Sequence, residues 1–226
     1  MSTAAHDEPT SAAPAPGAGD RAARLVLASG SPRRIELLRA LGFAPEVEPA
    51  DIDDAAVALG TGNAFVVPAA LAHFKARRVR DRREVRGAPS AWILAADTVC
   101  ERDGAVLGKP ADRDAARAMI RSLAGRAHDV VTGWCLLSPE GTARVGRDVA
   151  RIEIGELPEA LLEPFLDEGR WRGKAGGYNL PEVVALGWPV RCEGDPETVV
   201  GLPATRLAPM LRAALAGRPD GGVHAR

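Results

Sequence analysis

The chain has 226 residues, 46% of them hydrophobic, which is enough for a sizeable core in one large domain or in two lobes around a shared cleft. The 29 basic residues are matched by 30 acidic ones, which argues against a general nucleic-acid-binding protein with its marked basic excess. The three cysteines are odd in number and widely spaced, so they indicate neither a disulfide framework nor a zinc site.

The two ends of the sequence have the composition expected of tails. Residues 1–22 are rich in Ala, Pro, Ser and Gly without periodicity, and residues 217–226 are similar. We therefore expect two disordered tails around a folded domain at residues 23–216. The first residues lack the basic and hydrophobic regions of a secretory signal, and no apolar run is long enough to cross a bilayer. The expected setting is cytoplasmic, with no membrane.

The first folded element is expected to be a short buried strand that begins at Leu25 and leads through small residues into a helix. Ser31 suits the N-cap of this helix, and Pro32 suits its first position. Backbone N–H groups at the helix start, together with Arg33 and Arg34, would hold a polyphosphate. Arginines that simply lie in water explain this segment equally well when it is taken alone.

A second strand is expected at 45–47, followed by the acidic sequence Asp-Ile-Asp-Asp at 51–54. The next pattern predicts a helix from about 64 to 80. The charged run at 77–86 is interpreted as a solvated helix end and loop. The side chains expected to face inward on this helix are Leu71, Phe74 and Val79.

The apolar run at 92–96 predicts a buried strand that reaches Asp97 and Thr98 at its end. A carboxylate at the end of a strand points into the crevice beyond it, where it would bind a divalent metal or act as general base toward water. Residues 103–104, Asp-Gly, predict a hairpin turn, with the return strand at 105–107. Because that hairpin has its own turn residues, a mere turn role for Asp97 is the weaker explanation.

The rest of the chain alternates helices and strands, which predicts an α/β or α+β fold. Asp112 is the expected N-cap of the next helix, and Gly125 is its expected end. Two long strands, a helix and a glycine-rich loop follow, and a further strand precedes the final helix. The two strands are expected at 128–137 and 143–154, and the helix at 158–167. The loop is expected at 173–178 and the final helix at 203–216.

Three lysines add to the two arginines at 33–34. Each alone is more simply a surface charge, but together they favour a phosphate-binding pocket. The acidic cluster at 51–54 would bind a metal or lie in a solvated loop. No Ser-His-Asp or Cys-His set is visible, so carboxylates, cations and glycine turns indicate metal-assisted hydrolysis of a phosphoanhydride by water. The three lysines are Lys75, Lys109 and Lys174.

Five stretches follow one another in an order that matches a known family. They are Leu-Ala-Ser-Gly-Ser-Pro-Arg-Arg at 27–34, Asp-Ile-Asp-Asp at 51–54, Leu-Ala with Lys-Ala at 71–76, Ala-Asp-Thr-Val with Leu-Gly-Lys-Pro at 96–110, and Lys-Ala-Gly-Gly-Tyr at 174–178. With these motifs, the region from about Leu25 to Leu215 resembles the Maf family of nucleoside triphosphate pyrophosphatases.

The resemblance implies an α/β fold with a long mixed sheet and flanking helices in two lobes around a deep cleft. It also implies hydrolysis of a nucleoside triphosphate to the monophosphate and pyrophosphate with a divalent cation, Mg²⁺ or Mn²⁺. Asp97 matches the family's proton acceptor, and Asp53 and Asp54 match an acidic position that would share the metal with it. The residues that match positions around the substrate are Ser29, Arg33, Arg34, Lys75, Thr98, Lys109 and Lys174.

The sequence departs from the family at one position that is associated with base choice. Relatives that act on dTTP and UTP usually carry Gln there, and a branch associated with 7-methyl-GTP carries Glu. Here the position holds Pro181, which has no side-chain donor or acceptor. Glu182, one residue further on, and Asn179 are the two candidates to take over this contact. The base preference therefore stays open.

Two classes of function follow from these residues. The first is a nucleotide pyrophosphatase that acts on nucleoside triphosphates, including non-standard or modified ones. The second is a catalytically weak nucleotide-binding regulator of cell division, for which the altered loop at 179–182 is the main support. A nucleic-acid-binding domain is the weakest alternative, because the charge is balanced and only 4% of residues are aromatic. Whether two copies form a homodimer stays open.

Overall fold

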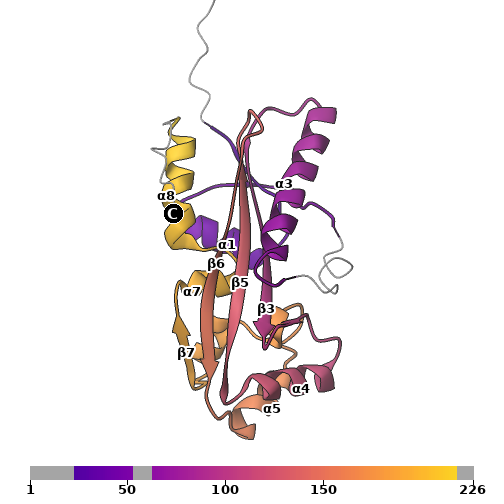
Figure 1. The fold of residues 1–226 in the computed structure, drawn as a ribbon, viewed down its shortest axis with the longest axis vertical. Coiled ribbons are helices and arrows are strands. Elements are labelled where there is room, and N and C mark those ends of the chain that lie inside the picture. The colour runs from indigo at the N-terminus through magenta and orange to yellow at the C-terminus, as the bar shows by residue number, and fades with distance from the viewer. Residues whose placement is uncertain (1–22, 53–62, 218–226) are drawn as a thin grey trace, which may run out of the picture.

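A mixed seven-stranded sheet forms the centre of the protein in the computed structural model, which describes residues 23–52 and 63–217 (Figure 1). Its strands are β1 (Leu25–Leu27), β2 (Glu46–Val47), β3 (Trp92–Arg102), β4 (Ala105–Leu107), β5 (Arg126–Leu137), β6 (Ala143–Ile154) and β7 (Val190–Glu193). They follow the order β2-β1-β3-β5-β6-β7, and β4 pairs with β3 off this path. β1 is parallel to β2 and β3, whereas the other pairs are antiparallel.

Helices flank the sheet in two lobes (Figure 1). The helices are α1 (Pro32–Ala40), α3 (Val67–Val85), α4 (Arg113–Leu123), α5 (Glu159–Asp167), the 3₁₀ turn η1 (Ala175–Gly177), α6 (Leu180–Ala185), α7 (Pro196–Val200) and α8 (Ala204–Leu215). One lobe holds α1, α3 and α8, and the other holds α4, α5 and α6. The long strands β3, β5 and β6 run through the molecule, which confirms the predicted mixed sheet with flanking helices.

In the first lobe, alternate side chains of the strands face opposite layers of helices. Ile93 and Ala95 of β3 pack with α3, whereas Leu94 and Ala96 pack with α1 and α8, as the two-residue period of a strand requires. The α3 face is made of small residues. At Gly133 of β5, an added Cβ atom would lie 2.1 Å from the backbone nitrogen of Ala69 in α3. The helix therefore lies unusually close to the sheet.

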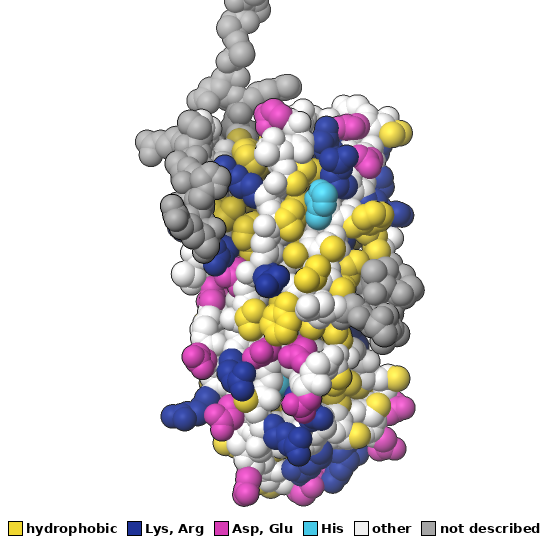
Figure 2. Space-filling model, in the orientation of Figure 1, with side chains coloured by type: hydrophobic (Ala, Val, Ile, Leu, Met, Phe, Trp, Pro, Cys, Tyr) yellow, Lys and Arg dark blue, Asp and Glu magenta, His cyan; other side chains and the backbone are white. Residues whose placement is uncertain are grey.

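The second lobe has a bulkier core of leucine, isoleucine and aromatic side chains. The rings of Phe165 and Trp188 lie 4.9 Å apart between their centroids. On the surface of this lobe, basic and acidic side chains lie together over α4 and α5 (Figure 2). These side chains pair across the two helices, and they are Arg113, Arg117, Arg121, Glu159, Glu163 and Asp167.

Several predicted elements are confirmed. The strands expected at 128–137 and 143–154 are β5 and β6, and the hairpin turn has Asp103 and Gly104 at φ values of 53° and 84°. Asp112 caps α4 by accepting a hydrogen bond from the backbone N–H of Ala115 at 2.8 Å. The short helices α6 and α7 were not predicted, because five or six residues give too little periodicity to detect.

Three predictions were wrong. The helix expected to end near residue 80 continues to Val85, because Arg82 and Arg83 pair with glutamates near β2 and hold its last turns. Phe74 faces outward, with 66% of its surface exposed, since the buried stripe of α3 runs along its other face. Asp97 lies in the middle of β3 and not at its end, because β3 goes on to pair with both β4 and β5.

Across the ranges that the structure describes, no helix combines the length and apolar composition needed to span a bilayer.

Candidate active site

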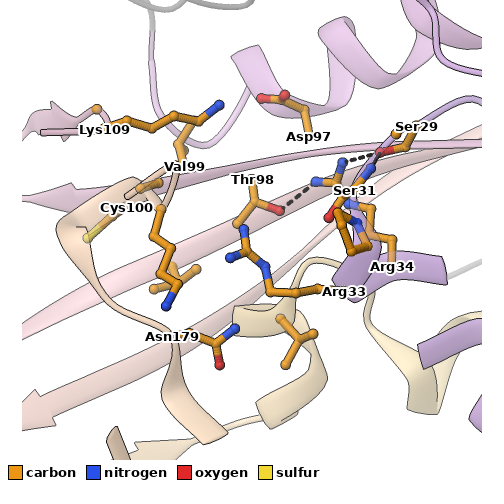
Figure 3. Close-up of a pocket in the computed structure, with 18 of the residues that line it drawn as sticks. Ser29, Ser31, Arg33, Arg34, Asp97, Thr98, Val99, Cys100, Lys109 and Asn179 are labelled. Atoms are coloured by element: carbon orange, nitrogen blue, oxygen red, sulfur yellow. Dashed lines mark hydrogen bonds between the residues drawn. The ribbon is translucent and has the colours of Figure 1, made fainter. Parts of the chain in front are cut away.

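A cavity of about 900 Å³ opens between the start of α1, the middle of β3, the β4 hairpin and the glycine-rich loop before α6. It is of the size that takes a small-molecule ligand. Among the described residues, six cationic side chains and two carboxylates line it, and Figure 3 labels four of the eight. The cations are Arg33, Arg34, Lys75, Lys109, Arg172 and Lys174, and the carboxylates are Asp51 and Asp97. Such an excess of positive charge suits a polyanionic ligand.

Arg34 ties the start of α1 to β3. Its guanidinium donates to the Ser29 hydroxyl and to the Thr98 hydroxyl, both at 3.0 Å, and to the Gly201 carbonyl at 2.9 Å (Figure 3). Thr98 in turn lies 2.8 Å from the Thr132 hydroxyl. The structure thus brings three predicted substrate-binding residues together, and the hydrogen bonds of Arg34 hold this side of the cavity in one arrangement.

Asp97 forms an ion pair with Lys75, with 2.7 Å between Nζ and Oδ1. Both side chains are buried, with 9% and 8% of their surfaces exposed. Lys75 reaches the carboxylate from α3, whose close approach to the sheet at Gly133 sets this distance. The second oxygen, Oδ2, has no hydrogen bond to any described residue, so one face of the carboxylate is available to a ligand.

Two further cations face the cavity without a partner in the described part of the chain. Arg33 of α1 and Lys109, which follows β4, make no ion pair or hydrogen bond there. In Figure 3 the Lys109 ammonium points toward the Asp97 carboxylate, and the Arg33 guanidinium extends over Thr98. Cations without a protein counter-charge are the groups that an incoming phosphate can bind at the lowest cost.

The glycine-rich loop forms the other side of the cavity. Gly173, Gly176 and Gly177 have φ values of 69°, 71° and 79°, a region that favours glycine, and so explain the loop sequence. Lys174 lines the cavity, but its ammonium is paired with Glu182 of α6. Glu182 does not line the cavity.

Arg170 shares the carboxylate of Glu182, at 3.2 Å.

Of the predicted metal-binding residues, only Asp97 is in the described part of the chain, since Asp53 and Asp54 lie outside it. Asp51 lines the cavity and pairs with Arg82 of α3 at 2.8 Å. Of the acidic cluster at 51–54, Asp51 is the carboxylate that the structure describes, and it already has a partner.

Tyr178 anchors the glycine-rich loop to strand β5. Its hydroxyl lies 2.6 Å from Nε2 of His128, and both side chains are buried. Burial lowers the pKa of His128 to about 4, with the charge of Arg102 adding to the effect. His128 is therefore neutral at neutral pH and anchors the loop through Tyr178. Burial also raises the pKa of the Cys100 thiol to about 12, so this cysteine at the cavity is no nucleophile.

One cavity residue, Arg172, was not assigned a role by the sequence motifs, whereas Asn179 was a candidate for contact with the base. Arg172 lies with its guanidinium carbon 5.1 Å from the centroid of the Trp171 ring. Asn179 also lines the cavity, and it lies in the lower part of Figure 3. Arg172 belongs to a run of charged residues that reads as surface, so no local signal could have singled it out.

The described donor groups at the cavity fit a divalent metal only together with a phosphate ligand. Within 23–52 and 63–217, no group of three or more His, Cys, Asp or Glu side chains lies close enough to hold an ion by itself. The free Oδ2 of Asp97 is one hard oxygen donor beside a cationic cavity. Mg²⁺ is usually bound by one or two carboxylates together with substrate phosphates. The residues fit a cation that enters with a phosphate ligand.

Comparisons with known proteins identify the family of this chain. Residues 24–214 match the family described as Maf-like protein. A dTTP/UTP pyrophosphatase of Brucella abortus is 39% identical over 194 residues, covering 83% of this chain and 90% of the relative. One of Rhodopirellula baltica is 40% identical over 199 residues, covering 87% and 85%.

Among solved structures, a HAM1 protein from Coxiella burnetii gives a TM-score of 0.48 at 15% identity, covering 86% of this chain and 99% of that chain. Similarity at that level says nothing about function. The sequence similarity to the pyrophosphatases is much stronger, and the family match spans nearly all of the described residues. The chain therefore belongs to the Maf family, as the five sequence motifs predicted.

Proposed function

We propose that this protein hydrolyses nucleoside triphosphates to nucleoside monophosphates and pyrophosphate. The observation that carries the proposal is a buried carboxylate, Asp97, inside a cavity whose described lining has six cations and two carboxylates. A triphosphate supplies the charge that such a cavity lacks, and the carboxylate supplies a base for an attacking water. The relatives named dTTP/UTP pyrophosphatase support the same reaction.

In this mechanism, Arg33 and Lys109 bind oxygens of the triphosphate, since neither has a protein partner among the described residues. Lys174 joins them when the phosphates replace Glu182 as its partner. Positive charge placed where the leaving pyrophosphate gains negative charge lowers the barrier to its departure. The backbone of the glycine-rich loop lets the ligand approach closely, because no side chains cover it.

Asp97 accepts a proton from a water that attacks the α-phosphorus. The new bond forms between this water oxygen and phosphorus, the bond to the β-phosphate oxygen breaks, and pyrophosphate leaves. Lys75 fixes the orientation of the carboxylate through Oδ1, which leaves Oδ2 directed to the water. Placing the base in mid-strand, held from α3, makes its position depend on the packed sheet and not on a loop.

The proposal includes a divalent cation and a pyrimidine substrate. A Mg²⁺ or Mn²⁺ ion held by Asp97 and phosphate oxygens would neutralise phosphate charge. For the base we infer dTTP and UTP, the substrates in the names of the relatives, with modified nucleotides as further candidates. A cytoplasmic setting belongs to the same proposal, and three free cysteines are consistent with it.

The test is pyrophosphate release with Mg²⁺ or Mn²⁺ across a panel of nucleoside triphosphates, comparing wild type with Asp97→Asn. We expect the variant to keep its fold and to lose turnover by about a hundredfold or more, the contribution of a positioned base. The matched control is Asp103→Asn, the same change in the exposed hairpin turn that follows on the same strand. Chelation of the metal should also stop release.

Near-normal turnover by Asp97→Asn would refute the role of this carboxylate. If wild type releases no pyrophosphate from any nucleotide, while nucleotides still raise its melting temperature, the protein is a nucleotide-binding regulator and not an enzyme. The complete set of Asp97, Lys75 and free cations favours the enzyme.

A further inference from the structure

Asn179 stands out among the polar side chains that line the cavity. It lies at the end of the cavity away from Asp97 and Lys109, beyond Arg33, with its carboxamide directed inward (Figure 3). Its side chain makes no hydrogen bond with any residue in the described ranges. A carboxamide has both a donor and an acceptor. Asn179 is half-buried and directed into the cavity, so both groups are available to a ligand there.

The other neutral hydrogen-bonding side chains at the cavity are mostly committed to the protein. The Ser29 and Thr98 hydroxyls accept hydrogen bonds from Arg34, and the Tyr178 hydroxyl is bound to His128. Ser31 is uncommitted, but it lies beside Arg33 and Arg34 at the cationic end. Among the described residues, Asn179 is therefore the neutral group that remains at the end away from Asp97 and Lys109, where a triphosphate held by Arg33 and Lys109 would place its nucleoside.

Pro181 removes one of the two backbone donors that could hold the carboxamide of Asn179 at the start of α6. Asn179 is the N-cap of α6, a position from which Asn normally accepts a hydrogen bond from the backbone N–H two or three residues on. The residue two positions on is Pro181, which has no N–H. The other possible donor is the backbone N–H of Glu182, three residues on, and the Asn179 side chain does not bind it either but points into the cavity.

Glu182 is the other candidate for contact with the base, but its carboxylate is already bound to other residues. Its carboxylate is paired with Lys174 and Arg170, and the residue does not line the cavity. A side chain that holds two cations would have to break both pairs to reach a nucleobase. Asn179 needs no such change.

We propose that Asn179 determines base selectivity by binding the edge of the nucleobase through its carboxamide. Its acceptor and donor match the N3–H and O4 of uracil or thymine, which present a donor beside an acceptor. This inference rests on the proposed hydrolysis, because it places the base at the end of the cavity opposite the phosphates. In this chain, the proline that cannot itself read a base also removes one capping partner of the asparagine two residues before it.

The test compares kcat/KM for dTTP, UTP and dCTP in wild type, Asn179→Leu and Asn179→Asp. Asn179→Leu removes both hydrogen-bonding groups, and we expect kcat/KM for dTTP and UTP to fall about tenfold or more. Asn179→Asp keeps a good N-cap but only accepts hydrogen bonds, so it opposes O4 of thymine and favours the amino group of cytosine. We expect the ratio of dCTP to dTTP activity to rise about tenfold in that variant.

The matched control is Asn63→Asp, the same change at an asparagine that bonds a backbone N–H outside the cavity. It should leave all base ratios as in wild type. Base ratios that stay within twofold of wild type in both Asn179 variants, while Asp97→Asn still loses turnover, would overturn this inference and leave the proposed reaction standing. Absence of pyrophosphate release from wild type with every nucleotide would instead overturn the proposed reaction itself.

Discussion

The cavity has two walls that are built in different ways. We call the first the sheet wall, formed by Ser29, Arg34, Lys75, Asp97 and Thr98, and the second the loop wall, formed by residues 172–179. Each side chain of the sheet wall is bound to another group of the protein within 3.0 Å. On the loop wall, Lys174 is paired with Glu182, which does not line the cavity, and Asn179 has no described partner.

This difference separates the chemistry from the choice of substrate. The sheet wall depends on the close packing of α3 and β5, so its geometry changes only if the core changes. The loop wall depends on glycines with positive φ and on side chains at the start of α6, which substitutions can exchange without moving Asp97. We infer that the first wall fixes the reaction and that the second tunes which nucleotide enters.

The largest effect is expected from Gly133→Ala, which attacks the sheet wall through its packing. The new Cβ would lie 2.1 Å from the backbone nitrogen of Ala69 and 2.2 Å from the carbonyl carbon of Pro68. Neither atom can move without shifting α3, so we expect a loss of about 3 kcal/mol in the free energy of unfolding. Turnover should fall too, because Lys75 moves with the helix. Urea titration and pyrophosphate release measure the two effects.

The control for this change is Gly108→Ala, where a Cβ would meet nothing within 4 Å. Its stability should stay close to that of wild type, whatever it does to the neighbouring cavity. Wild-type stability of Gly133→Ala would mean that α3 can leave the sheet at no cost, and the distinction between the two walls would be lost.

The second effect concerns the anchor of the loop wall. His128 has a pKa of about 4 in the folded protein and its ordinary value of 6.5 in the unfolded chain. Above pH 6.5 both states are neutral. As the pH falls from 6.5 to 4, the unfolded chain takes up a proton that the folded protein excludes, so stability decreases, by about 2 kcal/mol at pH 5.

His128→Gln should remove this part of the pH dependence, which is measured as the difference in the free energy of unfolding between pH 7.5 and pH 5. The control is Tyr178→Phe, which deletes the partner hydroxyl but keeps the buried imidazole. That variant should be less stable by about 1 kcal/mol with the wild-type slope. An unchanged slope in His128→Gln would show that this histidine takes up its proton in the folded state as readily as in the unfolded one.

The sequence predicted the sheet wall better than the loop wall, for physical reasons. The motifs around Arg34, Asp97 and Lys109 are local, and strand periodicity predicted β5 and β6 to within two residues at each end. The ion pair of Lys75 with Asp97 joins residues 22 positions apart, so only the packing of α3 on the sheet reveals it. The same holds for Asp97 in mid-strand, since the sequence alone does not show that β3 pairs on two sides.

The loop wall was harder to predict because its side chains compete for one another. Glu182 was a candidate for contact with the base, yet Lys174 lies eight residues away in sequence and forms an ion pair with it. A sequence lists both charges without showing that they neutralise each other. In the same way, Pro181 signals a lost contact, but the available carboxamide of Asn179 appears only once α6 and its N-cap are in place.

The smallest effect, and the one that tests this competition, is expected from Glu182→Gln. The pair with Lys174 is partly exposed, so its loss should change the free energy of unfolding by less than about 1 kcal/mol. The Lys174 ammonium then faces the cavity without a carboxylate, and we expect KM to fall a few-fold for every nucleotide, with kcat unchanged. The effect should shrink with added salt.

Glu168→Gln is the matched control, because Glu168 pairs with Arg170 but has no contact with Lys174. It should leave KM as in wild type. The pattern across bases decides what Glu182 does: an equal fall in KM for dTTP, UTP and dCTP means that it competes with phosphate for Lys174. A change in the ratio of dTTP to dCTP would mean that Glu182 itself contacts the base. In that case the loop wall would select its substrate by a charge, and the neutral Asn179 would only complete the fit.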